Sequence, residues 1–296
     1  MPERHPTTGA ILAFLAATFF GISGVVAGGV FETVEPAYVA QARSIIAAGL
    51  LLLYAWWRKA LRPGPGIWRL VLLGLNLATV NVTFYWAIDR LGVGPGATVQ
   101  FLAPVLVLIW LAVVRKEPIA VVAWVASVAA VLGIGLVTEA WTMDSSDLIG
   151  VASGLVSAFL FASYLVYGEY LGERYRPATV ASWGFVFASV FWAIVLPWWT
   201  FPFEDAGTVW LGLLVVGIVG TAIPFILDFF ALAMTSSGIV GIIATLEPPI
   251  AAFLAAVFLD QKLGAIQWLG IFLVAGAVAV VQWRGLGAEH ETTSIV

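Results

Sequence analysis

The chain has 296 residues and a net charge of −4, and 62% of its residues are hydrophobic while only 10% are charged. Soluble domains carry roughly 25% charged residues, so this composition excludes a soluble globular protein. There is no cysteine, and the only histidines are His5 and His290. These counts exclude disulfides, thiolate metal sites and a histidine metal site within a membrane. We therefore expect no metal and no cofactor.

Apolar stretches follow one another along the whole chain, each close to the ~20 residues that a helix needs to cross a bilayer. Ten spans are expected, at residues 8–30, 36–57, 66–88, 94–114, 118–138, 147–171, 178–199, 208–233, 238–259 and 263–283. The longest segment left over is the tail of residues 284–296. The predicted fold class is therefore an all-α integral membrane protein with ten transmembrane helices, and its chemistry is expected inside the helical bundle.

Basic residues gather in alternate loops between these spans. If the N-terminus lies inside, only Arg90 and Lys262 fall in outer loops. The inner positions are Arg4, Arg58, Lys59, Arg62, Arg69, Arg115, Lys116, Arg174, Arg176 and Arg284. Cytoplasmic loops carry an excess of Lys and Arg. This bias predicts that both termini are cytoplasmic.

The chain repeats itself at an offset of 144 residues, which aligns residues 94–137 with residues 238–281. Pro104 then matches Pro248, while Gly9 with Gly150 and Gly74 with Gly217 align more loosely. We expect a first five-helix repeat at residues 1–140 and a second at 141–296 that includes a short cytoplasmic tail. Because five is odd, the second repeat is inverted. Inverted repeats are typical of secondary transporters with a substrate site near the midplane, although a duplicated channel or scaffold is the alternative.

Two motifs indicate a family. Leu246-Glu247-Pro248-Pro249 lies in the ninth span, and Gln-Trp-Leu-Gly-Ile-Phe-Leu-Val-Ala-Gly fills residues 267–276. With ten helices in two repeats, the chain resembles the EamA-type drug/metabolite transporter superfamily over residues 9–282. Its 14% aromatic content makes it most similar to the YddG-type aromatic amino-acid exporters. The resemblance implies a multi-pass transporter of the bacterial cytoplasmic (inner) membrane. In one departure, residues 259–262 read Leu-Asp-Gln-Lys where many members have Gly-Glu.

Three ionisable residues lie within expected spans, where a charge costs at least ~2.5–3.5 kcal/mol. At ~1.5 Å per residue, Arg43 is ~10 Å from the outer end of its span, Asp228 ~8 Å from the inner end, and Glu247 ~13 Å from the inner end. We expect Asp228 near Glu247, and Arg43 near neither. Asp228 is either a protonatable or substrate-ammonium site or a structural carboxylate. Glu247 is assigned to function or gating, and Arg43 is either an interfacial or carbonyl-bonded residue or a ligand of a substrate carboxylate.

Polar and aromatic residues on several spans are candidates to line a central cavity. On the sixth span Ser157, Phe161 and Tyr164 share one helical face, although small-residue packing would also explain that stripe. The predicted substrate-binding residues are Asn76, Thr79, Asn81, Thr83, Tyr85, Trp86, Thr98, Gln100, Ser157, Phe161, Tyr164, Asp228 and Thr245. Predicted coupling or gating residues are Asp228, Glu247 and three kinking prolines, Pro104, Pro224 and Pro248.

The resulting hypothesis is a secondary transporter that exports small amphipathic metabolites across the cytoplasmic membrane by alternating access. Amino acids, aromatic ones first, are the leading substrate class. Spans 1, 3, 4, 6, 8 and 9 would surround the cavity. The expected partners are a small-molecule substrate and membrane lipid, with no nucleic acid. No phosphate-binding Gly-Lys-Ser/Thr loop is present, so no nucleotide-driven motor is expected. The alternatives are a transporter of a drug, nucleoside or sugar, a channel-like or structural subunit, and an intramembrane enzyme, which the lack of cysteine and internal histidine disfavours.

Overall fold

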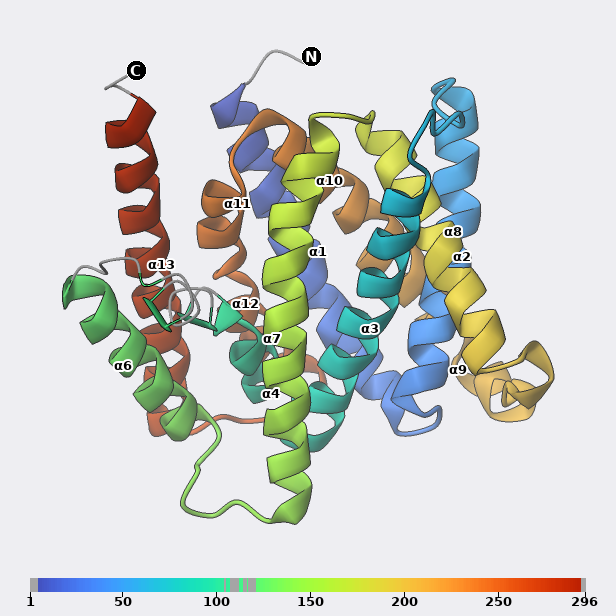
Figure 1. Cartoon of the computed structure of the whole chain (residues 1–296). Helices are drawn as coiled ribbons and strands as arrows, with labels where there is room; N and C mark the ends of the chain where they lie inside the picture. The colour runs from blue at the N-terminus through green and yellow to red at the C-terminus, as the bar shows by residue number, and fades with distance from the viewer. Residues whose placement is uncertain (1–4, 104, 107–111, 114–115, 117–120, 294–296) are drawn as a thin grey trace.

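The protein is a bundle of α-helices in the computed structural model (Figure 1), which describes residues 5–103, 105–106, 112–113, 116 and 121–293. The helices are α1 (Pro6–Phe31), α2 (Pro36–Trp57), α3 (Trp68–Leu91), α4 (Val93–Gln100), α6 (Val121–Val137), α7 (Ser145–Gly172), α8 (Pro177–Val195), α9 (Phe203–Gly217), α10 (Ile223–Met234), α11 (Ser237–Ala244), α12 (Glu247–Phe258) and α13 (Ala265–Thr293). A 3-10 turn, η1, covers Trp198–Thr200, and a π-helical turn, η2, covers Ile218–Ala222. Pro104, one of the predicted gating residues, lies outside the described residues.

Within that part of the chain, seven helical segments are long and apolar enough to cross a membrane. They are α1, α2, α3, α7, α8, the combined segment Phe203–Met234 and the combined segment Ser237–Phe258. Two shorter apolar helices cover Val121–Val137 and Ala265–Val281. The expected count of ten spans stays a prediction, because much of the span at residues 94–114 is not described.

Helices from the two halves of the sequence pack in matched pairs. α3 packs on α7 and α1 packs on α10, while α2 contacts α8, α4 contacts α12, and α6 contacts α13. If α7 is the counterpart of α1 and α10 that of α3, the α3–α7 and α1–α10 contacts are exchanged copies of one another, while α2–α8 and α6–α13 each join a helix to its own counterpart. This is the packing that a two-fold relation between the halves predicts.

Glycine contacts support the looser alignments. A Cβ on Gly9 would meet Thr235 at 2.9 Å, and one on Gly150 would meet Leu91 at 2.8 Å. Leu91 and Thr235 are themselves 144 residues apart, so the two contacts are equivalent. The pair Gly74 and Gly217 is 143 residues apart instead. The π turn η2 lies directly after Gly217 and takes up one more residue than an α-turn, which restores the offset of 144.

Two helices are interrupted at equivalent points of the repeat. After α4, the Phe101 N–H bonds Thr98 O at 3.1 Å, and after α11, the Thr245 N–H bonds Ile242 O at 3.2 Å. The N–H groups of the next residues, Leu102 and Leu246, likewise bond to the carbonyl three residues earlier. Both pairs of residues are again 144 apart, so each half breaks its fourth helix with the same tight turn. Discontinuous helices of this kind are typical of transporter binding sites.

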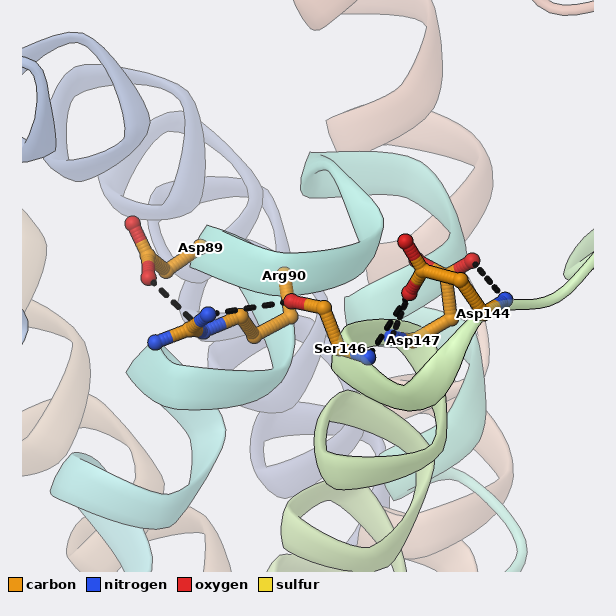
Figure 2. Close-up of polar contacts among 5 residues, drawn as sticks. All are labelled: Asp89, Arg90, Asp144, Ser146 and Asp147. Carbon is orange, nitrogen blue, oxygen red and sulfur yellow. Dashed lines mark hydrogen bonds and ion pairs between the residues drawn. The ribbon is translucent and has the colours of Figure 1, made fainter.

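The chain termini lie at one end of the bundle, and a group of polar contacts joins α3 to α7 at the other. α1 begins and α13 ends at the same end, where the α2–α3 and α7–α8 loops also lie (Figure 1). At the opposite end, Asp144 caps α7 by accepting from the N–H groups of Ser146 and Asp147 at 2.7 and 3.0 Å (Figure 2). Arg90, at the end of α3, donates to Ser146 Oγ at 3.0 Å and lies 3.5 Å from Asp89. This contact joins α3 to α7.

Exposed tryptophans lie near the ends of the membrane-crossing helices. More than half of the side-chain surface is exposed in Trp56, Trp57, Trp68, Trp141, Trp198, Trp199, Trp210 and Trp283. Tryptophan is enriched where a membrane meets water. The bundle therefore has the surface of a protein that is embedded in lipid.

Small residues allow close contact between α6 and α13. A Cβ on Gly270 would lie 2.6 Å from both Gly133 O and Val137 N, so it would clash with backbone. The two helices approach closely because no side chain stands between them there, as is common in membrane helix packing.

Candidate functional site

A small buried cavity lies between the two halves of the chain. Its volume is about 40 Å³, well below the ~300–1,000 Å³ of typical ligand pockets. It is lined by Phe20, Ser23, Arg43, Val80, Asn81, Phe84, Gln100, Phe161, Tyr164, Phe225 and Glu247. Each of the six spans expected around a central site contributes, through α1, α3, α4, α7, α10 and α12, and α2 adds Arg43. An amino acid does not fit in this conformation.

Arg43 is held by the π turn on the facing helix. It is 2% exposed, and its Nη2 donates to Gly220 O at 2.8 Å while its Nε donates to Thr221 Oγ1 at 2.7 Å. Pro224, four residues after Gly220, has no N–H and cannot donate to that carbonyl. The arginine therefore satisfies a carbonyl that the proline leaves without its helical partner, and a positive charge is fixed beside the cavity.

Unsatisfied polar atoms lie next to this charge. The Arg43 guanidinium carbon is 4.9 Å from the centre of the Tyr85 ring. Tyr85 Oη and Ser23 Oγ lie near one another and near Arg43, yet neither has a hydrogen-bond partner among the described residues. Buried polar atoms nearly always have a partner. These two hydroxyls, with the remaining guanidinium N–H groups, are therefore suited to bind water or an anionic group.

Two buried carboxyl groups of the second half, Asp228 on α10 and Glu247 on α12, lie close to one another. Asp228 Oδ2 accepts a hydrogen bond from Tyr164 Oη at 2.6 Å. Glu247 is 5% exposed and is close enough to Asp228 and Arg43 to interact electrostatically with both. We expected the two carboxyls to lie near one another, and they do. The prediction that Arg43 lies near neither of them is wrong for Glu247. Arg43 lies ~10 Å from the outer end of its span and Glu247 ~13 Å from the inner end, so in a ~30 Å core their levels differ by only ~7 Å. A long arginine side chain can cover that distance.

Glu247 begins α12 directly after the break in the helix. The next two residues, Pro248 and Pro249, have no N–H, so the helix cannot continue backwards through normal bonds. A carboxylate in the first turn interacts favourably with the positive end of the helix dipole. The break thus provides a place where a buried carboxyl is stabilised.

Aromatic rings form one wall of the cavity. Phe161 stacks on Tyr164 with centroids 6.1 Å apart, and Tyr164 meets Phe225 edge-on at 5.7 Å. Phe20 packs on Phe225 at 4.9 Å, and Phe101 packs on Phe161 at 5.5 Å. These rings come from both halves of the chain. They present a rigid apolar surface on which a hydrocarbon or aromatic group can pack.

Amide side chains complete the lining. Gln100 Nε2 donates to Ser157 Oγ at 2.7 Å, and Ser157 Oγ is 3.2 Å from Val80 O, to which it donates. Asn81 Nδ2 donates to Leu77 O at 2.6 Å. Gln100 and Ser157 therefore tie α3, α4 and α7 together, while Gln100 and Asn81 both face the cavity.

Several other candidate residues lie elsewhere. Thr79, Thr83, Thr98 and Thr245 each donate to a carbonyl three or four residues earlier in their own helix. Asn76 donates to Leu160 O at 3.1 Å and joins α3 to α7. Trp86 is 43% exposed. None of these six side chains is among those that line the cavity.

The repeat could have identified cavity residues that the sequence analysis missed. Phe20 and Ser23 precede Phe161 and Tyr164 by 141 residues, the same offset as Gly9 to Gly150. By the offset of 144, Phe225 is likewise the counterpart of Asn81, and Phe84 is the counterpart of Asp228. Taking the counterpart of each candidate residue in the other repeat would have identified them from the sequence. These four residues line the cavity, as does Val80, which the predicted site residues also omit.

A bundle of membrane-crossing helices with a polar cavity between two similar halves defines the class of membrane transporters. The model of the EamA-like transporter family matches residues 7–139 and 148–283. The chain therefore belongs to the EamA-like transporter family. It is a transporter rather than an enzyme, and a multi-pass protein of the bacterial inner membrane.

Named relatives agree with this assignment. The chain is 30% identical over 240 residues to the threonine/homoserine exporter RhtA of Escherichia coli (strain K12), covering 78% of this chain and 77% of that protein. It is 22% identical over 286 residues to the inner membrane transporter YicL of Salmonella typhimurium (strain LT2), covering 92% and 94%. A solved crystal structure has a similar fold, with a TM-score of 0.68 at 16% identity over 96% of this chain and 100% of that one.

Proposed function

We propose that the protein exports amino acids by alternating access, with the substrate held between Arg43 and Glu247. The observation that carries the proposal is that a buried cation and a buried carboxyl line one cavity. A zwitterionic amino acid carries the complementary pair of charges. Its carboxylate would bind the Arg43 guanidinium with the Ser23 and Tyr85 hydroxyls, and its ammonium would bind Glu247.

The aromatic wall supports aromatic amino acids as the first substrate class. Phe20, Phe161, Tyr164 and Phe225 offer faces and edges on which a substrate ring can pack. Threonine and homoserine form the second candidate class. They are favoured by the 30% identity to a threonine/homoserine exporter, and Asn81 and Gln100 could bind their hydroxyl groups.

Transport requires the cavity to enlarge, because about 40 Å³ holds no amino acid. The proposed hinges are the breaks after α4 and α11, together with Pro224 and Pro248 and, outside the described residues, Pro104. The repeats at residues 1–140 and 141–296 would rock about these points, with ten spans and both termini in the cytoplasm. The positive-inside distribution of the loops supports this orientation.

Asp228 and Glu247 are the proposed coupling residues. Each is a buried carboxyl in the membrane interior, where protonation removes the cost of a charge. The variants Asp228→Asn and Glu247→Gln are expected to lower the transport rate and to flatten its dependence on pH. Unchanged rates and pH profiles in both variants would exclude proton coupling through these groups.

Efflux from liposomes tests the substrate assignment. The purified protein is reconstituted in liposomes loaded with amino acids, nucleosides and sugars, and mass spectrometry follows what leaves, against liposomes without protein. We expect selective release of phenylalanine, tyrosine or tryptophan. Release of threonine and homoserine alone would replace the aromatic class with the second class, and release of only nucleosides or sugars would overturn amino-acid export.

Substrate analogues test the two-charge site without altering the protein. Removing the carboxylate of phenylalanine gives phenethylamine, which cannot bind Arg43. The lost charged hydrogen bond is worth ~1.5–3 kcal/mol, or roughly a 10- to 100-fold weaker competition for efflux. The variant Arg43→Gln should remove this discrimination, while the exposed Arg90→Gln should keep it. Equal competition by phenylalanine and phenethylamine in the unaltered protein would refute the role of Arg43.

A further inference from the structure

A second and larger pocket lies between the α2–α3 loop and the α7–α8 loop, at the end of the bundle where α1 begins (Figure 1). Its volume is about 450 Å³. Five basic side chains line it, Lys59, Arg62, Arg69, Arg174 and Arg176, and the described lining contains no acidic residue. Three of these come from the first half of the chain and two from the second, so the pocket is shared between the halves.

The positive charge of this pocket is compensated only in part. Arg174 lies 3.3 Å from Glu173, outside the pocket lining, and both side chains are largely exposed. Arg69 stacks on the Trp68 ring, 4.9 Å from its centre, and its buried Nε has no hydrogen-bond partner among the described residues. An anion in the pocket would relieve the repulsion among the cations and could accept from their N–H groups. Arginine forks match phosphate oxygens in geometry.

Hydrogen bonds between the halves hold the pocket in shape. Thr179 Oγ1 donates to Ala60 O at 2.7 Å, and Trp183 Nε1 donates to Leu61 O at 2.8 Å. Tyr175 Oη donates to Pro65 O at 3.0 Å. The α2–α3 loop is therefore clasped by side chains of the second half. A site organised in this way needs little ordering when a ligand binds.

The surrounding tryptophans set the depth of the pocket in the membrane. Trp56 and Trp57 at the end of α2 and Trp68 at the start of α3 are 66%, 69% and 57% exposed. Exposed tryptophans of membrane proteins sit at the level of the lipid headgroups. A phosphoryl group at that level belongs to a phospholipid rather than to free phosphate in solution.

We propose that this pocket binds the phosphoryl group of an anionic phospholipid. Because the ligand would contact basic side chains of both halves, it favours the conformation in which the two loops are clasped. The lipid thus acts on the equilibrium between conformations and is not the transported solute. The site is separate from the central cavity, so its assignment does not depend on the identity of the substrate.

Native mass spectrometry of the purified protein in detergent tests the proposal with three probes: phosphatidylglycerol, phosphatidylcholine and inorganic phosphate. The test variant is Arg62→Gln, and Lys59→Gln is added to it in a double variant. The matched control is Arg58→Gln, because Arg58 lies in the same loop, packs its guanidinium on Trp57 and does not line the pocket. Unfolding curves without lipid verify that each variant is folded.

The unaltered protein and Arg58→Gln should bind phosphatidylglycerol equally. The attraction of a basic side chain to an anionic lipid surface corresponds to a factor of ~5 in affinity, so we expect ~5-fold weaker binding for Arg62→Gln and ~25-fold for the double variant. Equal binding by all four proteins would overturn the site. Binding of phosphatidylcholine as strong as that of phosphatidylglycerol would overturn the requirement for an anionic lipid, and binding of inorganic phosphate alone would overturn the lipid as its source.

Discussion

Replacing Tyr164 with phenylalanine would remove one buried hydroxyl and leave the ring in place. Tyr164 Oη donates to Asp228 Oδ2 at 2.6 Å, and the two residues are 1% and 5% exposed. The ring packs edge-on against Phe225 and Phe229, with centroids at 5.7 and 5.6 Å. These apolar contacts do not involve the hydroxyl. The substitution therefore isolates the contribution of one hydrogen bond.

The size of the effect depends on the charge of the acceptor. Neutral hydrogen bonds between membrane helices average ~0.6 kcal/mol, whereas those to charged groups contribute ~1.5–3 kcal/mol. If Asp228 is ionised, Tyr164→Phe should lower the free energy of unfolding by the larger amount. Tyr167→Phe is the matched control, because Tyr167 Oη donates to a neutral acceptor, Arg69 O, at 3.0 Å. It should cost only ~0.6 kcal/mol.

Reversible unfolding in mixed micelles with increasing dodecyl sulfate measures both variants. A double-mutant cycle of Tyr164→Phe with Asp228→Asn then isolates the coupling between the two side chains. We expect the coupling to exceed ~1.5 kcal/mol. A loss for Tyr164→Phe no greater than that for Tyr167→Phe, at neutral pH, would refute the expectation that Asp228 accepts this hydrogen bond as an ionised group.

Two further substitutions test the packing and the capping of the bundle. Gly270→Ala places a Cβ 2.6 Å from Gly133 O and Val137 N, so it should lower the free energy of unfolding by ~1–3 kcal/mol, whereas Gly276→Ala, which meets nothing within 4 Å, should not. Equal stability of these two variants in the same micelle assay would exclude the close contact of α6 and α13. Asp144→Ala removes the cap of α7 (Figure 2) and should cost ~1 kcal/mol, and an unchanged unfolding midpoint would show that the cap contributes nothing.

The positions of the helices could be predicted because hydrophobic length and proline act locally. The expected span at residues 36–57 matches α2 at both ends, and Pro36 occupies its first turn. Pro177 begins α8 in the same way, although this helix ends at Val195 and not at residue 199, because Pro197 and the turn η1 follow. The family resemblance was also correct, since its motifs lie within single segments of sequence.

The direction of each polar side chain could not be predicted from spacing alone. Asn76 and Asn81 lie on the same helix, yet Asn76 bonds Leu160 O and Asn81 faces the cavity. The difference depends on which neighbouring helix covers each face, and that is a property of the tertiary packing. The partner of Arg43 was hidden for a similar reason. Its acceptor Gly220 O belongs to a π turn, and hydropathy does not distinguish a π turn from an ordinary helical turn.

The two halves share a backbone arrangement but not their charged residues, and this difference has an energetic consequence. The counterpart of Glu247 is Ala103, and the counterpart of Asp228 is Phe84. A rearrangement that exchanged the conformations of the two halves would repeat the same backbone geometry but would place both acids in different surroundings. In the proposed alternating-access cycle, the inward-open and outward-open forms would therefore differ in free energy, and each ~1.4 kcal/mol of difference would change their ratio tenfold. Under that proposal, the asymmetry of two acidic residues would give the carrier a preferred resting side.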